Sequence, residues 1–280
     1  MEYLERRRDL IETRLEDVLA SVDPAELSSE LENVVLAGGK RVRPTVSLLV
    51  CEAVGAQPED AVDFAVGVEL VHNASLVVDD IIDESDRRRD SPSAWSAFGH
   101  GPALIASDGL IGEAFALFST DERAMRAVSE AMVELGEGEA TELAAMPDSE
   151  DAYRQLARRK TGALFRAAAE LGAIAADADA RTVEAFGQYA EQVGIAFQIR
   201  DDVLDATGDA EQLGKPAGHD AEMDRPSIVQ VTDLSPAEAT ERARSEADAA
   251  LDQLETVPVE NEQAVEYLRD LANFVVERER

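Results

Sequence analysis

Apolar residues recur at helical spacing along nearly the whole of this 280-residue chain. In the first segment Leu4, Leu15 and Leu19 fall on one stripe, as on one face of a helix with 3.6 residues per turn. No alternation of apolar and polar residues persists long enough to indicate a strand. Helices are predicted at residues 60–83, 94–118, 122–146, 150–176, 179–207, 237–254 and 260–277. The pattern predicts an all-α fold, a single-domain bundle of about ten helices over residues 1–280.

The charge of the chain is strongly one-sided, with a formal net charge of -33 and only 5% aromatic residues. Such a composition can indicate disorder, but the helical periodicity favours a folded protein with an acidic surface. An acidic surface is tolerated best where salt screens the repulsion between its charges, so we expect a halophilic source. The same charge argues against nucleic-acid binding and against an anionic membrane surface.

Cys51 is the only cysteine, which excludes an intrachain disulfide and a cysteine-based zinc site. No signal peptide and no span of about 20 apolar residues is evident. We therefore expect a cytoplasmic protein without a membrane span.

Two matching acidic motifs carry the strongest chemical signal. Asp79-Asp80-Ile81-Ile82-Asp83 and Asp201-Asp202-Val203-Leu204-Asp205 each follow an apolar helical run. Residues four apart share a helix face, so the first and last aspartates of each motif point the same way. A solvated charge run would explain either motif alone, but two matches with the same apolar approach favour a functional pair.

Two facing carboxylate clusters would repel each other unless cations lie between them. Mg²⁺ takes oxygen ligands, keeps several waters and commonly bridges carboxylates to phosphates. No cluster of His or Cys accompanies the motifs, which argues against zinc or iron. A glycosidase pair of carboxylates would need only two such groups. The motifs therefore predict a magnesium site.

Lysine is scarce, with only three among the 26 basic residues. Lys40, Lys160 and Lys215 each lie beside or near a glycine, which allows a bulky anion to approach the backbone. Phosphate is the natural ligand for such lysines and for neighbouring arginines, although a single surface lysine would ordinarily be only solvated.

The chain resembles the trans-isoprenyl diphosphate synthase family over essentially its whole length. The resemblance rests on GGKRVRP (38–44), ELVHNASLVVDDIIDESDRRR (69–89), RKTGALF (159–165), FQIRDDVLD (197–205) and GKPAGHD (214–220), in that order. It implies an all-α bundle around a central apolar cavity, and a head-to-tail condensation of isopentenyl diphosphate with an allylic diphosphate. In that reaction Mg²⁺ and basic groups stabilise the departing pyrophosphate, and an allylic cation forms in a water-poor site.

The resemblance also implies roles for individual residues. The Mg²⁺ ligands, for about three ions per active site, would be Asp79, Asp80, Asp83, Asp201, Asp202 and Asp205. The allylic diphosphate would meet Arg88, Lys160, Lys215 and Arg225. The isopentenyl diphosphate would meet Lys40, Arg43, His72 and Arg89, and the allylic cation would be stabilised by Thr161 and Gln198.

The chain departs from the family pattern at four places, none of which removes a predicted metal ligand. Asp90 and Ser91 stand where the family often has Gly-Lys, Trp95 where histidine is common, Val78 where a histidine often precedes the first aspartate, and Arg225 where a lysine is usual.

Product length is expected to depend on the helix that precedes Asp79. Ala74 and Ser75 are small and would leave the path of a growing prenyl chain open, so we expect products of C20 or longer, geranylgeranyl diphosphate first among them. The floor of the path would be formed by residues one or two turns further back or on a neighbouring helix: Leu70, Val71, Phe115 or Phe118.

Four other interpretations remain open at this stage. They are a medium- or long-chain synthase for quinone side chains, a class I terpene cyclase, a non-catalytic subunit of a heteromeric synthase, and an acidic helical scaffold. The DDVLD form of the second motif argues against a cyclase, and the presence of both motifs argues against a non-catalytic subunit. The resemblance implies a homodimer.

Overall fold

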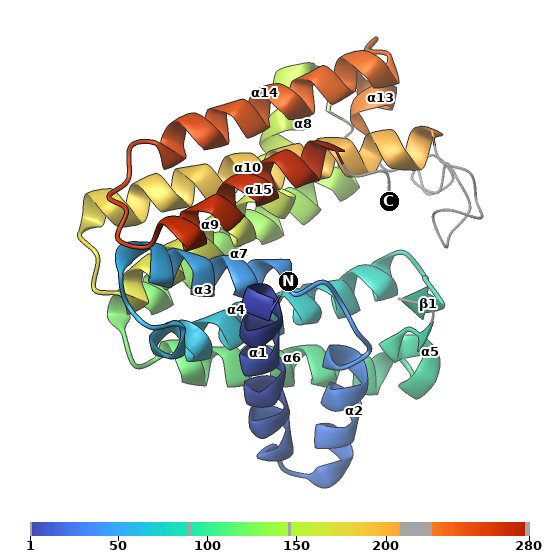
Figure 1. Ribbon diagram of the computed structural model, residues 1–280. Helices are drawn as coiled ribbons and strands as arrows, with labels where there is room; N and C mark the ends of the chain where they lie inside the picture. The colour runs from blue at the N-terminus through green and yellow to red at the C-terminus, as the bar shows by residue number, and fades with distance from the viewer. Residues whose placement is uncertain (1, 89–90, 145–146, 208–225, 278–280) are drawn as a thin grey trace.

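A computed structural model describes residues 2–88, 91–144, 147–207 and 226–277, and over these ranges the chain is all-α as predicted (Figure 1). The first half of the chain forms α1 (Glu2–Ala20), α2 (Ala25–Val35), α3 (Val42–Val54), α4 (Pro58–Ile82), α5 (Ala94–Phe98) and α6 (His100–Phe118). The second half forms α7 (Glu122–Ala144), α8 (Glu150–Ala157), α9 (Ala163–Ala175), α10 (Ala180–Thr207), α13 (Ile228–Val231), α14 (Pro236–Leu254) and α15 (Glu262–Glu277). Predicted site residues Arg89, Lys215 and Arg225 lie outside the described ranges.

Two predicted helices are interrupted in ways that the periodicity did not reveal. The stretch 94–118 divides into α5 and α6 at Gly99, whose φ of 91° lies in the left-handed region that glycine adopts without a steric penalty. The stretch 150–176 contains a π-helical turn, η1 (Arg158–Gly162), between α8 and α9. Single π turns inside α-helices occur frequently at functional sites.

A short hairpin follows α4, where the sequence gave no strand signal. The two-residue strands β1 (Arg87–Arg88) and β2 (Ser91–Pro92) pair antiparallel. The Trp95 indole Nε1 donates a hydrogen bond to the carbonyl of Ser85 at 3.0 Å. These contacts fold the segment after the first acidic motif back toward α5.

The core consists of two apolar clusters that share helices α3 and α9. One cluster joins these helices to α10, α14 and α15, and the other joins them to α1, α4 and α6. Figure 1 shows α10, α14 and α15 side by side in one layer, with α1 and α2 at the opposite end of the molecule. Helices α4 and α10 therefore belong to different halves of the core, and each ends in one acidic motif.

Helix α4 begins at a defined cap, which fixes its register. The Gln57 side chain and the Asp60 side chain form a reciprocal capping box, and Pro58 occupies the first helical position. Caps of this kind satisfy backbone donors that otherwise lack partners, typically stabilising a helix by about 1 kcal/mol. From this cap the helix runs 25 residues to Ile82, and Asp83 is its C-terminal cap.

The expectation that no segment is long and apolar enough to cross a membrane was wrong. By length and composition α4 and α6 both qualify, with 67% and 33% of their most apolar windows buried inside the molecule. Charged residues within these helices disguised the windows in the sequence. The finding is weak evidence for a membrane, because the core helix of a soluble protein passes the same test.

Candidate active site

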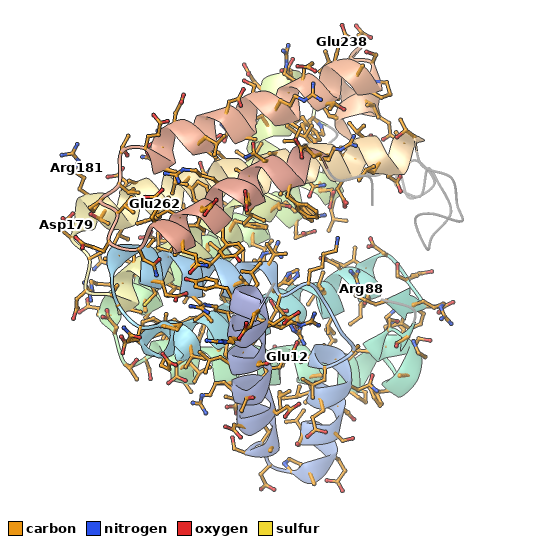
Figure 2. The ribbon with its side chains drawn as sticks, viewed as in Figure 1. Glu12, Arg88, Asp179, Arg181, Glu238 and Glu262 are labelled. Atoms are coloured by element: carbon orange, nitrogen blue, oxygen red, sulfur yellow. The ribbon has the colours of Figure 1, made fainter. Side chains whose placement is uncertain are left out.

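The first acidic motif occupies the C-terminal end of α4, and its middle carboxylate is buried. Asp80 is 2% exposed and accepts hydrogen bonds from Arg88 Nε and Nη2 at 2.6 to 2.9 Å. Asp79 and Asp83 are half-buried. Arg88 was predicted to contact an allylic diphosphate, and that role stays a prediction. In this structure its guanidinium, at the end of α4 in Figure 2, neutralises Asp80.

The second acidic motif lies in the last turns of α10, and its middle carboxylate is also buried. Asp202 is 3% exposed. Its oxygens accept hydrogen bonds from the Tyr153 hydroxyl at 2.5 Å, the Gln198 amide at 2.9 Å and the Ile228 backbone N–H at 2.9 Å. Asp201 is exposed, whereas Asp205 is buried. The middle aspartate of each motif thus packs inward, and the first aspartate is more accessible.

Thr161 and Gln198, predicted to stabilise a cation, are in direct contact. The Thr161 hydroxyl donates to Gln198 Oε1 at 2.7 Å, while Gln198 Nε2 donates to Asp202 at 2.9 Å. An ionised carboxylate can accept hydrogen bonds but cannot donate them. The nitrogen of the Gln198 amide must therefore face Asp202, which fixes the orientation of that amide. The carbonyl oxygen of that amide is therefore held toward Thr161.

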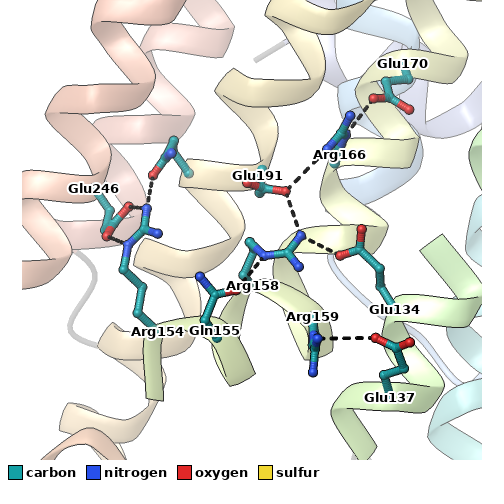
Figure 3. A network of polar contacts seen from close by, with 11 residues as sticks. Glu134, Glu137, Arg154, Gln155, Arg158, Arg159, Arg166, Glu170, Glu191 and Glu246 are labelled. Carbon is teal, nitrogen blue, oxygen red and sulfur yellow. Dashed lines mark hydrogen bonds and ion pairs between the residues drawn. The ribbon is translucent and has the colours of Figure 1, made fainter. Parts of the chain in front are cut away.

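The π-helical turn that carries Lys160 and Thr161 is fastened on both sides by ion pairs (Figure 3). Arg158 pairs with Glu134 of α7 at 2.6 Å and with Glu191 of α10 at 3.5 Å. Arg159 pairs with Glu137 of α7 at 3.3 Å. This network holds η1 in place between two long helices.

Lys160 is held by two carboxylates of α7 that the sequence analysis did not single out. Its Nζ contacts Glu139 at 3.4 Å and makes a close ion pair with Glu142. Gly138 permits this approach, because a Cβ at that position would come within 3.2 Å of Lys160 N and of Arg159 Cβ. The sequence did contain a signal for this lysine site: Gly138 lies inside a predicted helix and is followed by Glu139 and Glu142. These two glutamates are three residues apart and therefore share a face.

Burial raises the pKa of Glu139 to about 7. The charges of Asp79 and Glu142 act in the same direction, and Lys160 acts against them. The electrostatic influence of Asp79 on Glu139 shows that the end of α4 lies near this α7 pair.

Contacts join the second acidic motif to helix α7. They run from Asp202 through Gln198 to Thr161, whose neighbour Lys160 contacts Glu139, and Asp79 of the first motif lies near enough to raise the pKa of Glu139. In Figure 1 the C-terminal ends of α4 and α10 both point to the right side of the molecule. The structure therefore places Lys160, Thr161, Gln198 and Asp202 together, and their catalytic roles stay a prediction.

Arg43 and His72, predicted to bind isopentenyl diphosphate, also lie together. Arg43 Nη1 is 3.1 Å from His72 Nε2, and the guanidinium lies over the Phe165 ring at 4.6 Å from its centroid. Lys40 is exposed and lines a groove of about 500 Å³ between α1, α3 and α15. Arg43 and His72 are therefore in contact, and their binding of isopentenyl diphosphate stays a prediction.

Five of the predicted chain-length residues belong to the apolar cluster of α4 and α6 or pack against it: Leu70, Val71, Ala74, Phe115 and Phe118. Ser75 is half-buried and donates a hydrogen bond to the His72 carbonyl at 2.8 Å. Phe118 lies against Gly67, where a Cβ would come within 2.6 Å of its ring. Two cavities are described, of about 30 and 500 Å³, and neither is lined by these residues. The central apolar cavity therefore stays a prediction.

Within the described residues, no three His, Cys, Asp or Glu side chains lie close enough to hold one ion by themselves. The available donors are carboxylate oxygens divided between two helix ends. That donor set fits Mg²⁺, which usually completes its shell with water and substrate phosphate oxygens.

This all-α bundle, with two acidic helix ends and a lysine on a π turn between them, has the isoprenoid synthase fold of its solved structural neighbours. A profile of the polyprenyl synthetase family matches residues 24–268. The chain belongs to this family, and it is a prenyltransferase that elongates prenyl diphosphates in the trans configuration. Isopentenyl diphosphate and an allylic diphosphate are its implied substrates.

Characterised relatives from archaea support the assignment. A short chain isoprenyl diphosphate synthase of Methanothermobacter thermautotrophicus is 32% identical over 253 residues, covering 87% of this chain and 78% of the relative. A geranylgeranyl diphosphate synthase of Methanosarcina mazei is 35% identical, covering 79% and 71%. The crystal structure of a geranylgeranyl pyrophosphate synthetase from Pyrococcus horikoshii superposes with a TM-score of 0.89 at 32% identity, covering 99% and 98%.

Proposed function

We propose that this enzyme makes prenyl diphosphates of C20 or longer, with geranylgeranyl diphosphate as the main product. The observation that carries the proposal is a series of residues at four-residue steps on α4: Gly67, Val71, Ser75 and Asp79. Successive members of the series share a helix face, and the series winds slowly around the helix, by about 40° per step. Exposure falls along the series, from half-buried Ser75 to Val71 at 2%.

Phe118 closes the far end of this series. Its ring packs against Gly67, and the separation of Gly67 and Asp79 by twelve residue steps corresponds to about 18 Å along the helix axis. No bulky side chain of the series stands between them, because Ser75 and Val71 are small or medium in size. A growing prenyl chain that starts at Asp79 could therefore extend over several turns before it meets an aromatic ring.

We further propose that Asp79, Asp83 and Asp201 hold Mg²⁺ together with the substrate diphosphate. When bound, the metal would neutralise charge that develops on the departing pyrophosphate. Asp80 and Asp202 would instead act as anchors, since Arg88 and three neutral donors already occupy their oxygens. Asp205 is 5% exposed, and its place among the metal ligands stays a prediction.

The protein's own residues would divide the remaining work. Arg43 and His72 would hold isopentenyl diphosphate, and Lys160 would exchange its α7 carboxylates for the allylic diphosphate. The bond between the allylic carbon and its diphosphate oxygen breaks, and the isopentenyl double bond attacks the resulting cation. Thr161 and Gln198 would face that cation with their oxygens. A proton then leaves the new unit, and the released pyrophosphate can accept it.

The reaction is tested with labelled isopentenyl diphosphate and C5, C10 and C15 allylic primers, with and without Mg²⁺. Elongated diphosphates of C20 or longer, formed only with Mg²⁺, would support the proposal. Cyclised hydrocarbons would indicate a terpene cyclase, and absence of turnover would indicate a subunit or scaffold role. Products much longer than C20 would favour the alternative, a medium- or long-chain polyprenyl diphosphate synthase for quinone side chains.

Product length is tested by Ala74→Phe and Ser75→Phe, which place an aromatic ring one turn behind Asp79. We expect products of C15 or shorter, while Ser75→Ala should leave the length unchanged. Removing the floor with Phe118→Ala should lengthen the product. An unchanged product distribution in all of these variants would refute the proposed path.

We also propose that the enzyme is a homodimer. Leu104 and Ile105 of α6 are 50% and 59% exposed, and Val133 and Leu143 of α7 are 62% and 65% exposed. Exposed apolar side chains on two consecutive helices are typical of an interaction surface. Light scattering should give twice the chain mass, and Ile105→Glu should reduce it to the mass of one chain.

A further inference from the structure

The loop before α3 contains two adjacent cations that take opposite directions. Lys40 is exposed, whereas the Arg41 side chain is only 1% exposed. Arg41 also has a φ of 49°, in the left-handed region. A residue with a Cβ is uncommon there, and such strain persists where the surroundings over-determine the conformation.

The buried guanidinium of Arg41 joins three helices. Nε and Nη2 donate to the two carboxylate oxygens of Glu12 on α1 at 2.9 and 3.2 Å. Nη1 donates to Glu69 on α4 at 2.8 Å, and Nη2 donates to the carbonyl of Val35 at the end of α2 at 2.7 Å. Burying a charge is unfavourable unless it is paired and hydrogen-bonded, and these contacts meet both requirements.

The contact with Glu69 lies next to the predicted substrate site. Glu69 and His72 are three residues apart on α4 and share a face. Arg41 is bound to the first of them and Arg43, two residues further along, lies 3.1 Å from the second. Asn73 donates to the Glu69 carboxylate at 3.3 Å and so limits its movement. The start of α3 is therefore attached to α4 at two adjacent points.

We propose that Arg41 is a positioning residue which orients Lys40 and Arg43 toward isopentenyl diphosphate. Because its own side chain is held inward by contacts with α1, α2 and α4, the nearby residues Lys40 and Arg43 are held in fixed directions. Arg41 contacts no substrate itself in this proposal, which rests on the proposed function. Loss of its contacts should affect one substrate site and leave the other nearly intact.

The test compares Arg41→Lys and Arg41→Gln with wild type in steady-state kinetics with Mg²⁺, varying each substrate separately. We expect the KM for isopentenyl diphosphate to rise about tenfold or more, and the KM for the allylic diphosphate to change less than about twofold. Glu12→Gln keeps an oxygen acceptor at a site that is 28% exposed, so it should fold and show a smaller shift in the same direction.

The matched control is Arg7→Lys. Arg7 pairs with Glu52 through Nε at 2.9 Å, and the two side chains are 12% and 6% exposed. This pair joins α1 to α3 and includes no predicted site residue, so it reports the effect of weakening a buried ion pair alone. We expect Arg7→Lys to lower the melting temperature and to change the KM for isopentenyl diphosphate no more than the KM for the allylic diphosphate.

Non-additivity gives a second readout. If Arg41 acts through Arg43, the double variant Arg41→Lys/Arg43→Lys should raise the KM for isopentenyl diphosphate by less than the product of the single effects. Equal changes in both KM values, or a result for Arg41→Lys that matches Arg7→Lys, would overturn the inference. Failure of wild type to condense the substrates would instead overturn the proposed function, which keeps the two outcomes distinct.

Discussion

The ends of α4 and α10 carry the same five-residue pattern, but their buried carboxylates are satisfied in different ways. At the end of α4, Asp80 is paired with the guanidinium of Arg88. At the end of α10, Asp202 accepts hydrogen bonds from a phenol, an amide and a backbone N–H. Those donors are neutral, so they stabilise the carboxylate without cancelling its charge. Equal motifs thus acquire unequal electrostatics from the segments packed against them.

The difference also concerns what each anchor holds. Arg88 lies only eight residues beyond Asp80, so that contact organises the local hairpin after α4. Tyr153 and Ile228 are 49 and 26 residues away from Asp202. The second anchor therefore ties together α8, α10 and α13, and through Gln198 it reaches Thr161 on η1.

The largest expected effect is common to both ends. Asp79→Ala and Asp201→Ala should each lower turnover by about a thousandfold or more, equivalent to about 4 kcal/mol of transition-state stabilisation. Far-UV circular dichroism should remain unchanged, because neither side chain is fully buried. Asp108→Ala, at an exposed position of α6, is the control. If only one variant loses activity, the two ends do not act as a pair.

The α4 end differs further in having the α7 carboxylates beside it. The folded-state pKa of Glu139 is about 7 against an ordinary value of 4.5, so the folded protein retains a proton there that the unfolded chain loses. The contribution of Glu139 to the free energy of unfolding therefore falls as pH rises from about 4.5 to 7, and it stays low above pH 7. Glu139→Gln should increase the free energy of unfolding at pH 8 by about 2–3 kcal/mol.

Urea unfolding at pH 5 and pH 8 measures this effect. Glu137→Gln is a suitable control, since Glu137 belongs to the same helix but is 54% exposed in its pair with Arg159, and exposed pairs contribute little. A Glu139→Gln variant whose stability tracks wild type at both pH values would contradict the proposed burial of this carboxylate.

A direct comparison of the two anchors uses Arg88→Gln and Tyr153→Phe. The first leaves Asp80 buried without its cation and should destabilise the protein by about 2 kcal/mol, less than for a fully buried pair because Arg88 is 35% exposed. The second removes one hydrogen bond to a charged acceptor, worth about 1.5 kcal/mol. Thermal unfolding of both variants measures which loss of stability is larger. Equal losses, or a larger loss for Tyr153→Phe, would contradict the predicted difference between the two anchors.

The smallest expected effect is the change with salt concentration in the stability lost by Arg88→Gln and by Tyr153→Phe. In 1 M KCl the screening length falls to about 3 Å, so the stability difference between wild type and Arg88→Gln should shrink. The loss in Tyr153→Phe should stay constant, because a phenol carries no charge. The same titration tests the halophilic source inferred from the net charge of -33, which requires wild-type activity to increase toward molar salt.

Local patterns were sufficient for much of this protein. Helical periodicity predicted α10 almost to its boundaries, and the two acidic motifs with the glycine-flanked lysines led to the family and its reaction. Periodicity could not place the break at Gly99 or the π turn at Arg158–Gly162, because both depend on single backbone conformations within stretches that remain amphipathic.

Roles that depend on partners were harder to predict. Glu139 and Glu142 looked like ordinary residues of an acidic helix until η1 was packed against α7. Asp80 and Asp202 were predicted to bind metal with their neighbours, and that role stays a prediction, but nothing in the sequence states which aspartate of a motif faces the core. Arg41 resembled Lys40 and Arg43 for the same reason.

The sequence by itself determined the helices, the two acidic ends and the class of reaction, because helix periodicity and motif spacing depend on residues within a few turns of one another. The tertiary structure alone decided which of several adjacent charges turn inward. Arg41 is buried because Glu12 and Glu69 meet it from helices 29 and 28 residues away, whereas Lys40 beside it stays exposed. A charge is buried where packing supplies a counter-charge or hydrogen-bond donors, and such partners come from distant segments of the chain.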